Sequence, residues 1–342
     1  MTFTFTESNK EFNFLKDKNV SHLLSKWGVI EEGDSPAPQW YMKEFSFRCS
    51  DHSSENTNRR TLLRGKHQLH QFLSDFLKEK KEVPFRKALL ELYPCLGEAA
   101  STCSEKEGCA HLEFTHIPND VLDYQDMVDR LRQHKIVRDA RDKLGEENES
   151  AAGASLSLPI ARRSDTVLSG NAAVVSDELR ALFLLQKPGD EGGDDDEEED
   201  DFSGMGYGDF GGLSKKSLRS VLEGSVIKSS FLFHLLQRLV AGGGMMNQFE
   251  DDFAVYVDTS RTLFREWITP NLTVRRVEDE AADEKGWFVP SSEALIYQLH
   301  TPYSKDRKKR AVAPYYELFN YCYLILNIKQ QTCVFWYRGG VV

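Results

Sequence analysis

Two histidines and one glutamate have the residue types of a mononuclear iron site. His111 and Glu113 form a His-x-Glu pair, and His300 lies far along the chain. Two imidazoles and a carboxylate on one face of an iron ion leave positions open for oxygen and substrate, so this set would suit a metal-dependent oxygenase. Isolated His-x-Glu spacings are common in proteins, however. Convergence of the three side chains in the fold would separate this hypothesis from a non-enzymatic function.

Two glycine-rich segments could be read as phosphate loops. Gly206 to Gly211 matches G-x-G-x-x-G, but a run of acids precedes it where a dinucleotide site needs a strand, and those carboxylates would repel a pyrophosphate. Gly242 to Gly244 lacks the Gly-Lys-Ser/Thr of a P-loop. Signatures of hydrolases, zinc proteases and kinases are also missing from the sequence. We therefore expect no catalytic residues and no cofactor, in a protein that is not an enzyme.

The cysteines predict free thiols in a reducing compartment. Cys95, Cys103 and Cys109 lie close together near His111, but they contain no C-x-x-C pair, so we expect no metal site there. The N-terminus has no basic region followed by an apolar stretch, so it predicts no secretory signal. No apolar run approaches the ~18 residues of a membrane span. We therefore expect a cytoplasmic chain, with no membrane partner.

Charge is concentrated in two short runs. The net charge is −11, and ten acids without a base lie between Asp190 and Asp201, so the rest of the chain is nearly neutral. A neutral remainder predicts no nucleic-acid partner. The basic run KDRKKR, Lys305 to Arg310, is typical of a solvated hairpin loop; alternatively it could contact an acidic partner or the chain's own acidic run.

Residues 231–268 predict two helices joined by a glycine turn. An apolar helix from Phe231 runs into Gly242 to Gly244, and glycine adopts the left-handed conformation that ends helices without a Cβ clash. We expect at least one of these glycines to have positive φ. Glu250, Asp251 and Asp252 follow, where carboxylates favour the positive end of a new helix. The apolar positions of that helix share one face: Phe253, Tyr256, Val257, Phe264, Trp267 and Ile268.

This block resembles the cilia- and flagella-associated protein 300 family. In that family a glycine pair precedes a stretch that ends in Gln, an aromatic residue, Glu and Asp; here these are Gly243, Gly244, Gln248, Phe249, Glu250 and Asp251. An aromatic residue, an acid, Thr and a base follow, here Tyr256, Asp258, Thr259 and Arg261. Weaker similarity covers much of the chain, at Phe3, Phe5, Phe12 and Trp27, at 136–139, at 176–180 and at 321–339.

The resemblance implies a role in cilia or flagella. The family assists the assembly and transport of outer and inner axonemal dynein arms, as a non-enzymatic adaptor or assembly factor. It implies a cytoplasmic and axonemal location, with dynein arm assembly factors, axonemal dynein subunits and intraflagellar transport machinery as partners. A stable structural component of the axoneme is the alternative within this class. The motif residues named above are the candidates for partner contact or a structural motif.

The order of elements predicts an α+β fold. We expect helices over 59–81, 85–93 and from Asn119, then 176–186, 217–223, 230–241 and 250–268. Strand patterns follow at 271–277, 293–300 and 320–337, so the helices should pack on a C-terminal antiparallel sheet. The five tryptophans should lie in the core: Trp27, Trp40, Trp267, Trp287 and Trp336.

Composition divides the chain into five parts. We expect residues 1–140 to form an N-terminal α+β part and 215–342 a C-terminal α+β part that completes one composite fold with it. Between them lie a flexible small and polar insertion at 141–173, a short helix at 174–187, and an acidic, glycine-rich segment at 188–214. The acidic segment has too little apolar surface to offset its ordering entropy, so we expect both insertions to be disordered.

Overall fold

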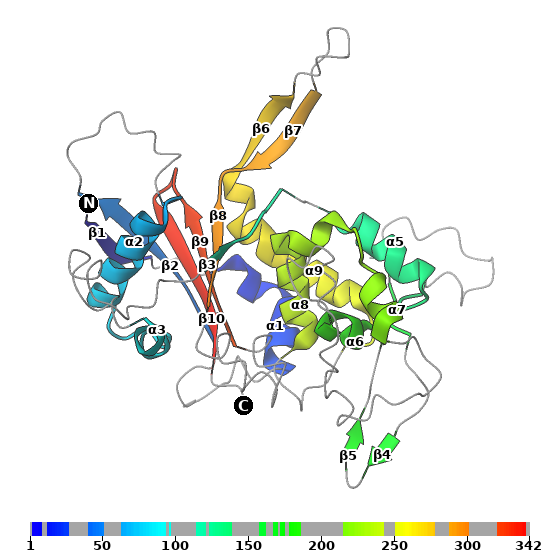
Figure 1. Ribbon diagram of the computed structural model, residues 1–342. Helices are drawn as coiled ribbons and strands as arrows, with labels where there is room; N and C mark the ends of the chain where they lie inside the picture. The colour runs from blue at the N-terminus through cyan, green and yellow to red at the C-terminus, as the bar shows by residue number, and fades with distance from the viewer. Residues whose placement is uncertain are drawn as a thin grey trace. The chain divides into compact units, whose positions relative to one another are not determined.

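A computed structural model gives the α+β fold shown in Figure 1. It describes residues 2–8, 12–26, 40–50, 63–93, 96, 114–120, 123–138, 157–161, 167–169, 172–174, 178–185, 215–242, 250–277, 287–300 and 320–339. The chain divides into two compact units. The first joins residues 1–120 to 263–342, and the second comprises 121–262.

The first unit is built on a six-stranded antiparallel sheet. Its strands lie in the order β1-β2-β10-β9-β8-β3. Their bounds are β1 Phe3–Glu7, β2 Trp40–Cys49, β10 Thr332–Arg338, β9 Tyr321–Asn327, β8 Leu295–Leu299 and β3 Phe114–His116. Three strands from the N-terminal part therefore share one sheet with three from the C-terminal part.

This topology corrects the expectation of a C-terminal sheet. Of the strands expected there, β8, β9 and β10 lie in the main sheet, but β6 (Leu272–Val277) pairs with β7 (Trp287–Ser292) in a separate two-stranded sheet. The main sheet is completed instead by β1, β2 and β3. The strand patterns were visible in the sequence, but strand pairing is non-local and does not follow from them.

One face of the main sheet is covered by helices α2 (Lys66–Glu79) and α3 (Arg86–Leu92) (Figure 1). The core beneath them is rich in phenylalanine. Phe72 of α2 lies 5.1 Å from Phe3 and 4.9 Å from Phe5, measured between ring centroids. Phe76 lies 4.3 Å from Phe335 in a stacked arrangement. Alternate residues of each strand face this core, as the period of two requires.

The opposite face of the sheet carries an aromatic cluster. Trp336 of β10 lies 4.7 Å from Tyr321, 5.2 Å from Tyr323 and 5.3 Å from Trp267 between ring centroids. Trp267 also contacts Phe14 of the 3₁₀ turn η1 (Asn13–Lys16), which precedes helix α1 (Lys18–Lys26). Trp267 and Trp336 are buried, as expected. Trp40 is half-buried, and Trp27 and the side chain of Trp287 lie outside the described residues.

The second unit is mainly helical in its described part. Its helices are α5 (Gln125–Gln133), α6 (Glu178–Leu185), α7 (Lys215–Ser220) and α8 (Phe231–Ala241), with the 3₁₀ turn η6 (Val226–Ser229), the start of α9 (Phe253–Trp267) and the short strands β4 (Val167–Ser169) and β5 (Ala172–Val174). The ring of Phe183 on α6 lies 5.5 Å from Phe233 of α8 and 6.4 Å from Phe253 of α9. Helix α6 thus contacts both helices of the pair expected from the sequence.

Helices α2, α5 and α9 begin later than the sequence indicated, and α9 starts at Phe253 instead of Glu250. Helix α2 starts at Lys66, after Gly65, because Leu63 has a left-handed backbone with φ of 64°. Helix α5 starts at Gln125, and Asn119 does not cap it. The side-chain Nδ2 of Asn119 instead donates to Ser292 Oγ at 3.1 Å and to the Ala294 carbonyl at 3.0 Å. Asp123 Oδ1 instead accepts from the Gln125 amide at 3.1 Å. Within the described ranges, every helix is too short or too polar to cross a membrane.

Candidate partner-binding site

The start of α9 is organised by one carboxylate. Asp252 Oδ1 accepts hydrogen bonds from the backbone N–H groups of Ala254, at 2.9 Å, and Leu158, at 2.8 Å. Its Oδ2 accepts from the Ser157 hydroxyl at 2.6 Å. Asp252 is therefore the N-cap of this helix, since it satisfies an N–H that has no partner within the first turn. It also binds a segment almost a hundred residues earlier in the chain.

That segment, residues 157–161, is here called the strap. The Phe253 amide donates to the Leu158 carbonyl and the Ile160 amide to the Asp251 carbonyl, both at 2.9 Å. On the strap's other side, the Arg138 amide donates to the Pro159 carbonyl and the Ala161 amide to the Ile136 carbonyl, also at 2.9 Å. The strap thus joins the end of α5 to the start of α9. It lies inside the region 141–173, for which the sequence predicted a flexible insertion.

The described motif residues divide into buried and exposed ones. Tyr256 and Thr259 are buried, and the Tyr256 hydroxyl accepts from the Glu250 amide at 3.1 Å. Asp251 and Arg261 are exposed. Gly243, Gly244, Gln248 and Phe249 lie outside the described residues. Tyr256 and Thr259 therefore shape this region from inside, and only the exposed residues can contact another molecule.

Helices α5 and α9 are linked beneath Arg261. The Tyr124 hydroxyl and Ser260 Oγ lie 2.6 Å apart and are buried. Burial raises the pKa of Tyr124, so the phenol stays protonated. The Arg261 guanidinium lies over the Tyr124 ring, 5.6 Å from its centroid, and within 3.5 Å of Asp258. Arg261 is thus an exposed cation held over an aromatic face.

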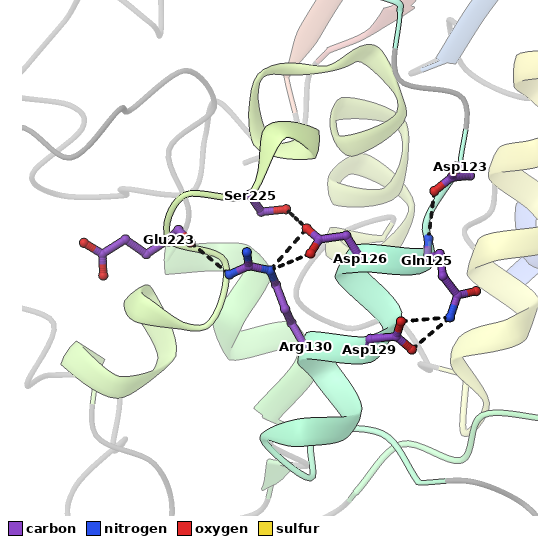
Figure 2. A network of polar contacts seen from close by, with 7 residues as sticks. All are labelled: Asp123, Gln125, Asp126, Asp129, Arg130, Glu223 and Ser225. Carbon is purple, nitrogen blue, oxygen red and sulfur yellow. Dashed lines mark hydrogen bonds and ion pairs between the residues drawn. The ribbon is translucent and has the colours of Figure 1, made fainter. Parts of the chain in front are cut away.

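A polar network fixes the N-terminal half of α5 to the turn before η6 (Figure 2). Asp126 Oδ2 accepts from the Ser225 hydroxyl at 2.5 Å, and both Asp126 oxygens accept from Arg130 Nε. Arg130 Nη1 donates to the Glu223 carbonyl at 2.9 Å. The Ser225 hydrogen bond, followed by Arg130, lowers the pKa of the Asp126 carboxyl. The sequence analysis missed this network, although the Asp126–Arg130 spacing of four is a recognisable helix pair.

Helix α8 is buried on every side, including its polar residues. Ser230 caps it, with its Oγ accepting from the Phe233 amide at 3.4 Å, and Gly242 ends it with φ of 77°. The positive φ expected in the glycine turn is therefore confirmed at Gly242. Burial, and secondly the charge of Arg238, lower the pKa of His234 to about 3, so this imidazole is neutral at pH 7.

The iron hypothesis rests on residues that are only partly described. His111 and Glu113 lie outside the described residues. His300 follows β8, and its Nε2 lies 3.1 Å from Thr115 Oγ1. Within the described part of the chain, no group of three or more His, Cys, Asp or Glu side chains could hold a metal ion. Cys49, Cys322 and Cys333 are free thiols, whereas Cys95, Cys103 and Cys109 are not described.

Comparison of the sequence with models of known protein families gives a match. The model of the family Cilia- and flagella-associated protein 300 matches residues 222–337. This segment is similar to that family, and the match covers less than half of the chain. The match contains α8, the capped start of α9 and strands β6 to β10. It confirms the resemblance seen at 231–268, whereas the weaker similarities at 3–27, 136–139 and 176–180 lie outside it. Neither a curated protein nor a solved structure matches the chain.

Proposed function

We propose that the protein acts in cilia or flagella, in the assembly and transport of outer and inner axonemal dynein arms, as a non-enzymatic adaptor. The family match over residues 222–337 carries this proposal, because the family is named for its association with cilia and flagella. The more specific role in dynein-arm assembly rests on the resemblance of the motif at 243–261 to this family. The partners are dynein arm assembly factors, axonemal dynein subunits and the intraflagellar transport machinery.

The charged surface around α5 and α9 suits an adaptor. Arg261 is exposed over the Tyr124 ring, and α5, which carries the exposed Asp126 and Asp129, belongs to the same unit. The Tyr124–Ser260 hydrogen bond and the strap hold the two helices in a fixed arrangement, which lowers the entropy lost when a partner binds. Charged residues at the rim of such a surface select the partner and accelerate association.

Electron microscopy of a deletion strain tests the function. Loss of the protein should remove outer and inner dynein arms and leave the microtubule doublets intact. Flagella with normal arms would reject the proposal. Re-expression of the protein should restore the arms, which excludes a second lesion as their cause.

Affinity purification tests the surface. The tagged protein should recover dynein heavy chains or assembly factors from the cytoplasm of ciliated cells. Arg261→Ala should reduce this recovery, because it removes the exposed cation beside Tyr124. Arg48→Ala, at an exposed arginine of β2, is the matched control and should not. Quantitative retention in salt-extracted axonemes would instead favour a stable structural component.

A further inference from the structure

The N-terminal strand β1 lies at the edge of the main sheet, where it could accept another strand. The Ser50 amide donates to the Thr2 carbonyl and the Ser8 amide to the Glu44 carbonyl, so the even-numbered residues of β1 bond to β2. In an antiparallel pair the alternate residues direct their N–H and C=O groups outward. The amides of Phe3 and Phe5 therefore point to the open edge.

Two carboxylates of α2 occupy these outward amides. Asp75 Oδ2 accepts from the Phe3 amide, and Glu79 Oε2 accepts from the Phe5 amide, both at 2.9 Å. The spacings match, since four residues of helix span about 6 Å and two residues of strand about 6.8 Å. The helix thus presents one acceptor for each donor on the edge.

Both carboxylates are held in place through their other oxygen. Gln71 Nε2 donates to Asp75 Oδ1 at 2.8 Å, and Lys80 Nζ lies 3.2 Å from Glu79 Oε1. Beneath them, the rings of Phe72 and Phe76 pack on Phe3 and Phe5 at centroid distances of 4.9 to 5.1 Å. Packing therefore fixes the helix against the strand, and the polar partners fix the acceptors.

The sequence of β1 makes an uncapped edge hazardous. Residues 2–6 read Thr-Phe-Thr-Phe-Thr, an alternating segment without charge, proline or glycine. High β-propensity and low charge favour pairing between identical exposed strands. Thr4 and Thr6 are exposed and uncharged, and Glu7, the charged residue of β1, lies at the end of the strand in an ion pair with Lys43.

We propose that Asp75 and Glu79 cap the β1 edge and keep it from adding the β1 strand of a second copy of this chain. The carboxylates take the place of a neighbouring strand. Their removal uncovers two adjacent donors on an alternating Thr/Phe strand, and two copies then pair antiparallel through β1. Capping by a charged acceptor also repels the carboxylates of an approaching copy.

Sedimentation of the full chain tests the proposal. Asp75→Ala/Glu79→Ala should form a dimer whose population grows with concentration, whereas the wild type should remain a monomer. Glu82→Ala/Asp120→Ala removes the same charge from two exposed positions without a described bond to β1, and it should remain monomeric. A folded Asp75→Ala/Glu79→Ala protein that stays monomeric would overturn the proposal.

Two further variants identify the edge and the mechanism. Thr4→Lys, added to the double alanine variant, should restore the monomer because two lysines would face each other across the paired strands. A dimer that persists associates elsewhere and contradicts the proposal. Asp75→Asn/Glu79→Gln keeps an acceptor oxygen at each site and should remain monomeric. Dimerisation of this variant would mean that charge alone keeps the copies apart.

Amide exchange tests the cap in the wild-type protein, even if the alanine variant does not fold. The Phe3 and Phe5 amides should be protected, because both are hydrogen-bonded at an edge that is otherwise open. Their exchange should accelerate at least about tenfold in Glu79→Ala for Phe5 and in Asp75→Ala for Phe3. Unprotected amides in the wild type would refute the cap.

Discussion

Gly242 shows how one residue ends the most deeply buried helix. Its φ of 77° and ψ of −159° lie in a region that is essentially restricted to glycine, because a Cβ would clash with the backbone. The backbone amide of Gly242 still donates to the Arg238 carbonyl at 3.1 Å, and this hydrogen bond completes the last helical turn of α8. The chain can then turn away from a helix with no exposed face.

Substitution of Gly242 should therefore destabilise the second unit. Gly242→Ala and Gly242→Val should each lower the free energy of unfolding by about 1–3 kcal/mol, with valine the worse because it is β-branched. Chemical denaturation measures the loss. Gly65→Ala is the control: Gly65 precedes α2 with φ of −80°, which any residue adopts, so its loss should stay below about 1 kcal/mol. An unchanged Gly242→Ala protein would contradict this account.

His234 makes the stability of the second unit depend on pH. Its pKa is about 3 in the folded protein and near 6.5 when unfolded, so between these values the unfolded chain binds the extra proton. Stability is full above pH 6.5 and should fall, through this residue, by up to about 1.4 kcal/mol per pH unit as the pH decreases toward 3. Denaturation of wild type and His234→Gln between pH 7 and 4 measures this slope. Equal slopes would show that His234 is not responsible.

At the scale of elements, the strap links helices that are distant in the sequence. Six of its hydrogen bonds reach either the end of α5 or the start of α9, and three polar groups converge on Asp252. Leu158 and Ile160 are buried, so the strap also contributes apolar packing. The start of α9 is therefore stabilised from outside the helix as well as by its own cap.

Asp252 should be the most sensitive residue of this junction. Asp252→Ala removes the cap and two hydrogen bonds to a charged acceptor, so it should cost about 2–3 kcal/mol of stability. It should also accelerate exchange of the Leu158 and Ala254 amides. Asp252→Asn keeps the oxygen that both amides bind and should lose less. Equal losses in the two variants would show that the charge matters and the cap geometry does not.

At the scale of the whole molecule, the local features were predictable and the pairings were not. Ser230, Gly242 and Asp252 act within a few residues of themselves, so residue type and position placed the ends of α8, and placed the start of α9 to within three residues. The Thr/Phe alternation of residues 2–6 is likewise a local strand pattern, and it forms most of β1. Strand β2 pairs with β1 on one side and with β10 on the other. The β2–β10 pair joins residues from opposite ends of the sequence, and no local pattern encodes which strand pairs with which.

The candidate site shows the same division. The sequence identified the motif at 243–261. Of its described members, Tyr256 and Thr259 are buried and Arg261 is exposed. The contacts of Ser157 and Tyr124 could not be anticipated, because Ser157 lies 95 residues from Asp252 and Tyr124 lies 136 residues from Ser260. A composition of small and polar residues gave no indication that Leu158 and Ile160 are buried.

The central position of β10 has a consequence for protein synthesis and for inherited truncations. Strands β1 and β2 emerge early from the ribosome, but β10 is the strand that joins them to β9, β8 and β3. Until it is made, the backbone groups of Phe45 and Phe47 that face β10 have no strand partner on that edge. A stop codon before Thr332 would leave the sheet in two halves, so such a truncation should behave as a null allele.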